Sequence, residues 1–187
     1  MDFRFLIASA SRRTEAIIAR ESRTALVVWG FVASFCLLLL VAIIAAPVAL
    51  AVGHTGFASA IYKSFSFLCH QIPERSFHIA GHKFAVCSRC TGLYSGFAFA
   101  TLGYPIFRSL KRTDTPRIIW LLLSAVPLLI DFSLTYFGIW QNTHLTRFTT
   151  GALFGAVAAI YILPGLIELS ASLRRRLQRP AQTQSTL

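Results

Sequence analysis

Hydrophobic and polar positions are segregated along this chain into long blocks. Four apolar runs stand out, and the basic residues flank them; the runs cover 25–53, 90–107, 118–140 and 148–173. A helix that spans a bilayer needs about 20 mostly apolar residues. Runs one, three and four meet this requirement, so the pattern predicts a bundle of four transmembrane helices. The second run is the shortest and contains Pro105, so a re-entrant or interfacial helix is the alternative prediction there.

The composition agrees with a membrane protein. Only 13% of the residues are charged and 55% are hydrophobic, whereas soluble domains carry about 25% charged residues. We therefore predict an all-α membrane protein with a single transmembrane domain, 25–173. A basic interfacial segment, 1–24, would precede this domain, and a basic, disordered tail, 174–187, would follow it.

The positions of the basic residues predict the orientation. The net charge is +11, and lysine and arginine close to membrane ends stay in the cytoplasm. With both termini inside, thirteen of the 18 basic residues are cytoplasmic and five are outside. This predicts a multi-pass protein of the cytoplasmic (inner) membrane. The lipid bilayer is the expected partner, and a homo-oligomer is compatible with the pattern. Nucleic acid is not expected, because the basic residues form no stripe with aromatic residues.

The segment between the first two runs would lie outside the cytoplasm, and it concentrates the reactive side chains. Three of the four cysteines and three of the five histidines lie between residues 68 and 96. Just before them, residues 57–68 place apolar side chains on one helical face, which predicts a short amphipathic helix at the membrane surface.

One interpretation of this cluster is a metal site. Cys87 and Cys90 form a Cys-x-x-Cys pair, and Cys69 supplies a third sulfur. Three sulfur ligands and one nitrogen ligand suit tetrahedral zinc, while iron or copper remain open on ligand type. The candidate nitrogen ligands are His70, His78 and His82. A four-cysteine iron–sulfur cluster fits less well, because Cys36 lies deep in the first apolar run, about 17 Å from its inner end.

Two other interpretations of the cysteines stay open. Cys87 and Cys90 begin the second run, where a helix N-terminus would favour the thiolate. They could therefore act with Cys69 as a membrane thiol–disulfide oxidoreductase, with a quinone as the acceptor. Alternatively, two of the three cysteines could form a structural disulfide.

Asp131 is the one acidic residue well inside an apolar run. An unpaired charge at that depth is unfavourable by about 2.5–3.5 kcal/mol, so a basic partner is expected. Arg147 is the first choice as that partner, with Arg75 and Arg89 as alternatives. The residue would then either orient the helices as a buried ion pair or serve as a polar relay in a small transporter or assembly factor.

Two of the runs begin with similar glycine motifs. "TGLYSG" opens the second run and "TGALFG" opens the fourth, and both have glycines four residues apart. Small residues at this spacing allow helix backbones to approach each other closely. The motifs therefore predict helix packing through residues 91–96 and 150–155.

Three motifs and one acidic residue form a recognisable signature: "CHQIPERSF" at 69–77, "CSRCTGLYSG" at 87–96, Asp131, and "RFTTGALFG" at 147–155. This signature resembles that of an uncharacterised family of small prokaryotic membrane proteins, classed as a domain of unknown function. The resemblance covers residues 69–155 and implies a multi-span membrane protein without implying an activity. It gives weight to the residues that match the signature, which are Cys69, His70, Gln71, Pro73, Glu74, Arg75, Cys87, Arg89, Cys90, Asp131 and Arg147. His78 and His82 lie outside the signature.

The sequence thus leads to a metal-binding membrane protein as the first hypothesis, with zinc as the first choice of ion. Its ligands would be Cys69, His70, Cys87 and Cys90. Arg75, Arg89, Asp131 and Arg147 would surround them as a polar floor. The sequence contains none of the usual hydrolase, kinase or nucleotide-binding motifs.

Overall fold

The chain folds into a predominantly helical structure, as seen in a computed structural model that describes residues 3–110, 112 and 114–178. The side chains of α1 are described from residue 22 onwards. In chain order the elements are α1 (Phe3–Ala51), α2 (Thr55–Ser66), the short 3₁₀ helix η1 (Pro73–Arg75), β1 (His78–Ile79), β2 (His82–Lys83), α3 (Ser88–Phe107), α4 (Ile119–Tyr136) and α5 (His144–Gln178).

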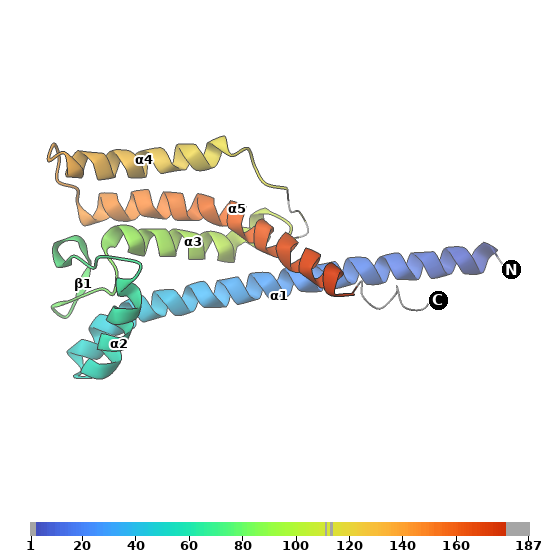
Figure 1. The fold of residues 1–187 in the computed structure, drawn as a ribbon, viewed down its shortest axis with the longest axis horizontal. Helices are drawn as coiled ribbons and strands as arrows, with labels where there is room; N and C mark the ends of the chain where they lie inside the picture. Colours follow the sequence, from blue (N-terminus) through green and yellow to red (C-terminus); the bar gives the residue numbers. More distant parts are fainter. Residues whose placement is uncertain (1–2, 111, 113, 179–187) are drawn as a thin grey trace.

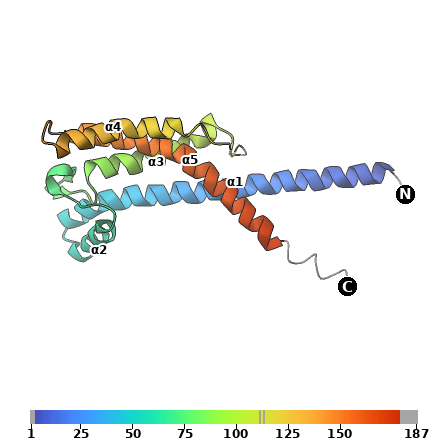
Figure 2. The same ribbon diagram turned by 45° about the horizontal axis from the view of Figure 1, so that its top comes forward.

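The four long helices run roughly side by side, and the small elements gather at one end of them (Figure 1). Contacts join α3 to α5, α5 to α4, and α1 to α2, α3 and α5. α1 ends and α3 begins at the end where α2 and the β-strands lie, and α4 and α5 meet at that same end. The view in Figure 2 shows the same arrangement, with α1 extending well beyond the other helices at the opposite end.

Three helices of the described part are long and apolar enough to cross a membrane: Ser22–Ala51, Ile119–Tyr136 and His144–Leu177. These correspond to the first, third and fourth apolar runs. The second run also forms a helix, α3, which is 20 residues long but is not among the three. Its buried residues include Ser88, Thr91 and Thr101, so much of its surface faces protein. A helix packed between others needs fewer apolar side chains than one that faces lipid.

The helix ends differ in several places from the sequence predictions. The basic segment expected at 1–24 is continuous with the first span, because α1 runs unbroken for 49 residues from Phe3. α5 continues to Gln178, so the first residues of the predicted tail are helical, while 179–187 lie outside the described residues.

α3 and α5 pack through the two predicted glycine motifs, facing each other. A Cβ atom built at Gly92 or Gly96 of α3 would collide with the backbone carbonyl of Phe148 or Ala152 on α5. On α5, a Cβ atom at Gly151 would collide with the carbonyl of Arg89, and one at Gly155 would collide with the carbonyl of Leu93. No larger residue fits at these positions without moving a backbone, which confirms the packing role predicted from the sequence.

The segment between α1 and α3 is more structured than the sequence indicated. The predicted amphipathic helix is α2, which buries Ala58 and Phe65. After it, β1 and β2 pair antiparallel, a small exception to the all-α prediction. Their two-residue turn has positive φ angles at Ala80 (49°) and Gly81 (80°), as tight hairpin turns of type I′ require.

A compact apolar cluster ties this segment to the first helix. Ile43 and Ala46 of α1 pack with Phe65 and with Ala85 and Val86, and Cys69 belongs to the same cluster. The backbone N–H of Ala85 donates to the carbonyl of Ile43. These contacts fix the chain on both sides of Cys69 relative to the start of α3.

Candidate metal and thiol site

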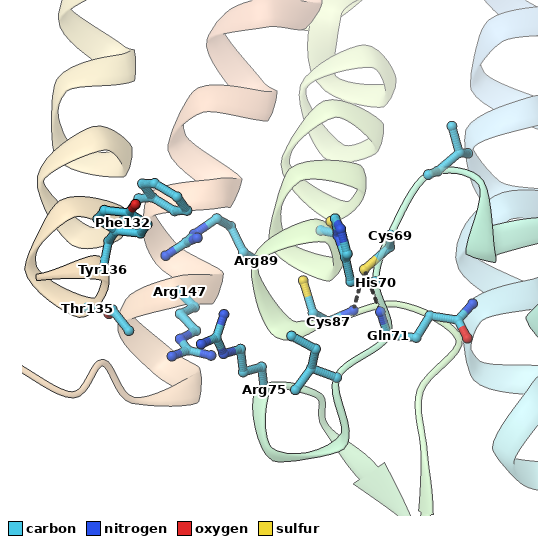
Figure 3. Close-up of a pocket in the computed structure, with 13 residues that line it drawn as sticks. Cys69, His70, Gln71, Arg75, Cys87, Arg89, Phe132, Thr135, Tyr136 and Arg147 are labelled. Carbon is cyan, nitrogen blue, oxygen red and sulfur yellow. Dashed lines mark hydrogen bonds between the residues drawn. The ribbon is translucent and has the colours of Figure 1, made fainter. Parts of the chain in front are cut away.

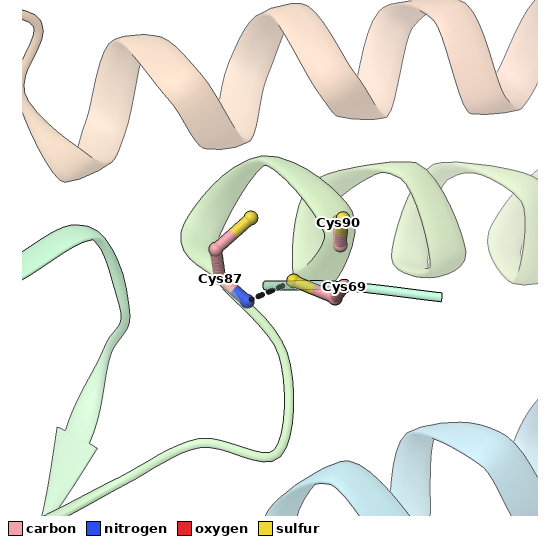
Figure 4. Close-up of side chains that lie close together, drawn as sticks. All are labelled: Cys69, Cys87 and Cys90. Carbon is pink, nitrogen blue, oxygen red and sulfur yellow. Dashed lines mark hydrogen bonds between the residues drawn. The ribbon is translucent and has the colours of Figure 1, made fainter. Parts of the chain in front are cut away.

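Three of the four cysteines meet at the beginning of α3. Cys69 follows α2, Cys87 occupies the N-cap position of α3 and Cys90 lies in its first turn. Their three sulfur atoms all lie within 4.8 Å of one another, and Figure 4 shows them converging. All four cysteines of the chain lie in the described part, and all are free thiols. Cys36, buried in α1, is not part of this group, as the sequence predicted.

The sulfur of Cys69 accepts several hydrogen bonds. The backbone N–H groups of Cys87 and Gln71 donate to it at 3.3 and 3.5 Å. The thiols of Cys87 and Cys90 also act as donors, and together these bonds hold the pKa of the Cys69 thiol far below its usual range despite its burial. Hydrogen bonds to a charged form favour that form, so these donors favour the thiolate form of Cys69.

Gln71 holds the turn that presents Cys69. Its φ angle is 52°, a left-handed conformation that is unfavourable for a residue with a side chain. The buried side chain of Gln71 donates to the carbonyl of Tyr62 at 2.7 Å, and the backbone carbonyl of Gln71 accepts a bond from Lys83 Nζ at 2.6 Å. These two bonds offset the strain. They keep the N–H of Gln71 directed at the Cys69 sulfur.

The histidines are not gathered with the sulfur atoms. His70 is exposed and lines the adjoining pocket, but the group of mutually close ligand atoms does not include it. His78 and His82 lie on the β-hairpin and are likewise outside that group. His144 of α5 is bonded at 2.9 Å to Ser88 within the Cys-x-x-Cys motif.

Asp131 is buried and is paired with Arg89, which lies between Cys87 and Cys90 in the sequence. Its carboxylate accepts a bond from the Arg89 guanidinium at 2.5 Å. The sequence analysis predicted a basic partner for Asp131 with Arg147 as the first choice, and this choice was wrong; the partner is the alternative, Arg89. Arg89 reaches it from the first turn of α3, and its guanidinium also lies 5.7 Å from the ring of Phe132. The side chain of Asn142 donates to the backbone carbonyl of Asp131.

A pocket of about 380 Å³ opens beside the sulfur atoms. Figure 3 shows it between the Cys69 turn on one side and the ends of α4 and α5 on the other. Three guanidinium groups line it together with the thiols, and they belong to Arg75, Arg89 and Arg147. The structure thus brings all seven non-histidine site residues predicted from sequence to one end of the bundle.

Two residues that shape the site could not be identified as such from the sequence. The role of Gln71 depends on its backbone conformation, and the only signal for it was its place in the family-like motif. His144 is far from Ser88 along the chain. Its involvement would have required knowing that α3 and α5 pack through their glycines.

Residues 69–161 match the family described as "Predicted membrane protein (DUF2085)". An uncharacterized protein of Methanocaldococcus jannaschii is 36% identical over 109 residues, which cover 58% of this chain and 70% of that protein. An uncharacterized protein of Methanothermobacter thermautotrophicus is 38% identical over 96 residues, which cover 51% of this chain and 85% of the other. No solved structure matches the chain significantly. The matched region begins at Cys69 and contains every residue of the thiol group and every arginine of the pocket.

Proposed function

The chain belongs to the DUF2085 family of predicted membrane proteins, and we propose that it is a membrane-embedded metal-binding protein with zinc as its preferred ion. The observation that carries this proposal is the convergence of three sulfur atoms within 4.8 Å of one another. Zinc–sulfur bonds of about 2.3 Å at a tetrahedral centre separate the sulfur atoms by about 3.8 Å. A contraction of about 1 Å at most would therefore bring these three onto one ion.

The surroundings of the sulfur atoms fit a bound cation. Metal ligands must be deprotonated, and the bonds to the Cys69 sulfur favour its thiolate. Hydrogen bonds from neighbouring groups commonly orient the ligands of a metal. Cys69, Cys87 and Cys90 would hold the ion. The fourth position would go to His70, on the same pocket, or to a ligand from solvent.

We expect one equivalent of zinc per chain in purified wild-type protein and less than about a tenth of that in Cys87→Ser. Loss of one thiolate removes a ligand that the other two cannot replace. Elemental analysis of protein purified without chelator gives the measurement. Cys36→Ser is the matched control, because it removes a buried cysteine outside the group and should retain its zinc. Substoichiometric metal in wild type that is unchanged in Cys87→Ser would refute the proposal.

A thiol–disulfide oxidoreductase is the second candidate, and the same sulfur convergence supports it. A disulfide between Cys87 and either Cys69 or Cys90 would release two protons and two electrons to an acceptor such as a quinone. Thiol counting on the preparation used for elemental analysis separates the two candidates. Metal-free protein with two fewer reactive thiols before reduction than after it indicates the redox function.

The orientation forms part of the proposal. With α3 as a fourth span, the chain crosses the cytoplasmic membrane four times, which places the thiol site on the outer side and both termini in the cytoplasm. The asymmetry of the basic residues and the alternating directions of the four long helices support this orientation.

Two exposed positions at opposite ends of the bundle test the orientation. A membrane-impermeant maleimide should label Ser64→Cys of α2 in intact cells. It should label Thr115→Cys, in the connection between α3 and α4, only after permeabilisation. Both residues are exposed, and wild-type protein supplies the background from its own cysteines. The reverse pattern would place the thiol site in the cytoplasm.

A further inference from the structure

Arg147 is a buried cation without a partner in the described part of the chain. The residue is only 8% exposed, and its Nε atom is buried without a hydrogen-bond acceptor. The described residues contain two ion pairs, Arg89–Asp131 and Arg108–Asp114, and Arg147 is in neither. A buried charge left unpaired destabilises a protein strongly, so such a residue needs a counter-charge from elsewhere.

Its neighbours increase this need. Arg75 and Arg89 lie close enough for their positive charges to act on Arg147, and all three line the same pocket. Figure 3 shows the guanidinium groups of Arg75 and Arg147 beside each other. The nearby carboxylate, Asp131, is already bound by Arg89 at 2.5 Å. The charges of Arg75 and Arg147 therefore remain uncompensated by a carboxylate contact.

The thiols do not remove this imbalance. Three thiolates exceed the charge of a bound divalent ion by one unit only, so a metal-loaded site would neutralise at most one of the two arginines. A pocket with the proposed metal bound therefore keeps an excess positive charge.

We infer that Arg147 and Arg75 bind a phosphate-type oxyanion in the pocket beside the three thiols. A guanidinium presents a planar fork of donors that matches two oxygen atoms of a phosphate or carboxylate. A tetrahedral oxyanion can satisfy two such forks at once, whereas a carboxylate has only two oxygens. The pocket volume of about 380 Å³ is in the range of small-ligand sites.

The oxyanion has two physical sources, free phosphate and the headgroup of an anionic phospholipid. Free phosphate would enter from the aqueous side of the site. A headgroup is suggested by the exposed apolar side chains on the rim of the pocket, Leu68, Phe132 and Tyr136. The chemistry at the two arginines is the same in both cases.

The test compares full-length wild-type protein with Arg147→Gln and Arg75→Gln, each purified with its metal in a neutral detergent. Titration calorimetry with inorganic phosphate at constant ionic strength gives one readout. Native mass spectrometry of protein reconstituted with phosphatidylglycerol or phosphatidylcholine gives the other. We expect each variant to weaken binding of phosphate, or of phosphatidylglycerol, by about tenfold or more, because a charge-assisted hydrogen bond is lost. Arg117→Gln is the control, since Arg117 is exposed and does not line this pocket.

Binding of inorganic phosphate identifies a free anion, and selective retention of phosphatidylglycerol without phosphate binding identifies a lipid headgroup. Binding of neither probe to wild type, or equal binding by wild type and Arg147→Gln, would overturn the inference. Folding is controlled by melting without added anion, where Arg147→Gln should be at least as stable as wild type because it removes an unpaired buried charge. Zinc content is measured in every sample, so a failure of the metal proposal is seen separately from a failure of anion binding.

Discussion

Gly155→Leu is expected to prevent accumulation of the folded protein, whereas Gly165→Leu in the same helix should leave it near wild-type levels. A Cβ atom at Gly155 would collide with the backbone carbonyl of Leu93 on α3, while one at Gly165 has no atom within 4 Å. Overpacking typically destabilises by about 1–3 kcal/mol. Here the obstacle is a backbone, which cannot rotate away, so we expect more than about 3 kcal/mol.

Two quantities are measured. The first is the melting temperature of detergent-solubilised protein, with size-exclusion chromatography as the readout of folded protein. The second is the protein level in membranes. Gly165 is exposed and lies in the same helix. Gly165→Leu therefore shows the effect of adding a leucine to α5 without a collision with another backbone. Similar melting temperatures for the two variants would mean that α3 and α5 do not approach each other as closely as the structure shows.

The expected loss of folded Gly155→Leu protein follows from the packing of α3 against α5. Its N-terminal turn carries Cys87, Arg89 and Cys90, and Gly151 of α5 lies directly against the backbone of Arg89. Helix packing and site assembly are therefore the same event at this end of the bundle. A variant that separates α3 from α5 should lose the thiol group and the arginine pocket together.

The sequence predicted the helices and the proximity of Cys87 to Cys90 because both depend on local pattern. A long apolar run is sufficient to predict a helix of spanning length. The glycine motifs identified the packing faces of α3 and α5. The Cys-x-x-Cys pair at the start of a helix placed two thiols within one turn, and Cys69 was a strong candidate to join them.

The choice of ion-pair partner could not be predicted in the same way. Depth along a helix follows from residue number, but the direction in which Asp131 points depends on how α4 is rotated against α3. Arg147 and Arg89 both lie at the right level, and the structure selects Arg89. The hydrogen-bond partners of Gln71 depend similarly on an uncommon backbone conformation, which no spacing rule indicates.

The Arg89–Asp131 pair connects the thiol-bearing turn of α3 to α4. Its loss should therefore lower the stability of the whole helical bundle. Asp131 is 8% exposed. The bond to Asp131 comes from Nη2 of Arg89, and the Nε atom of Arg89 is buried without an acceptor. Without the carboxylate, the contact with the ring of Phe132 is the one that remains for this guanidinium among the described residues. The structure contains a second ion pair, Arg108–Asp114, in which the acidic side chain is 72% exposed, and this pair provides a natural control.

Asp131→Asn is expected to destabilise the folded protein by about 3 kcal/mol, because removing one partner of a buried pair leaves the other charge uncompensated. Asp114→Asn should change stability by less than about 1 kcal/mol, as is usual for exposed pairs. Denaturant titration of the purified variants gives both values, and the double variant Arg89→Gln/Asp131→Asn should recover part of the loss, since no lone charge then remains.

Unchanged stability of Asp131→Asn would contradict a structural role for the pair. Normal protein level with loss of a cellular phenotype would favour Asp131 as a polar relay, because only a relay needs the carboxylate for a purpose other than holding Arg89.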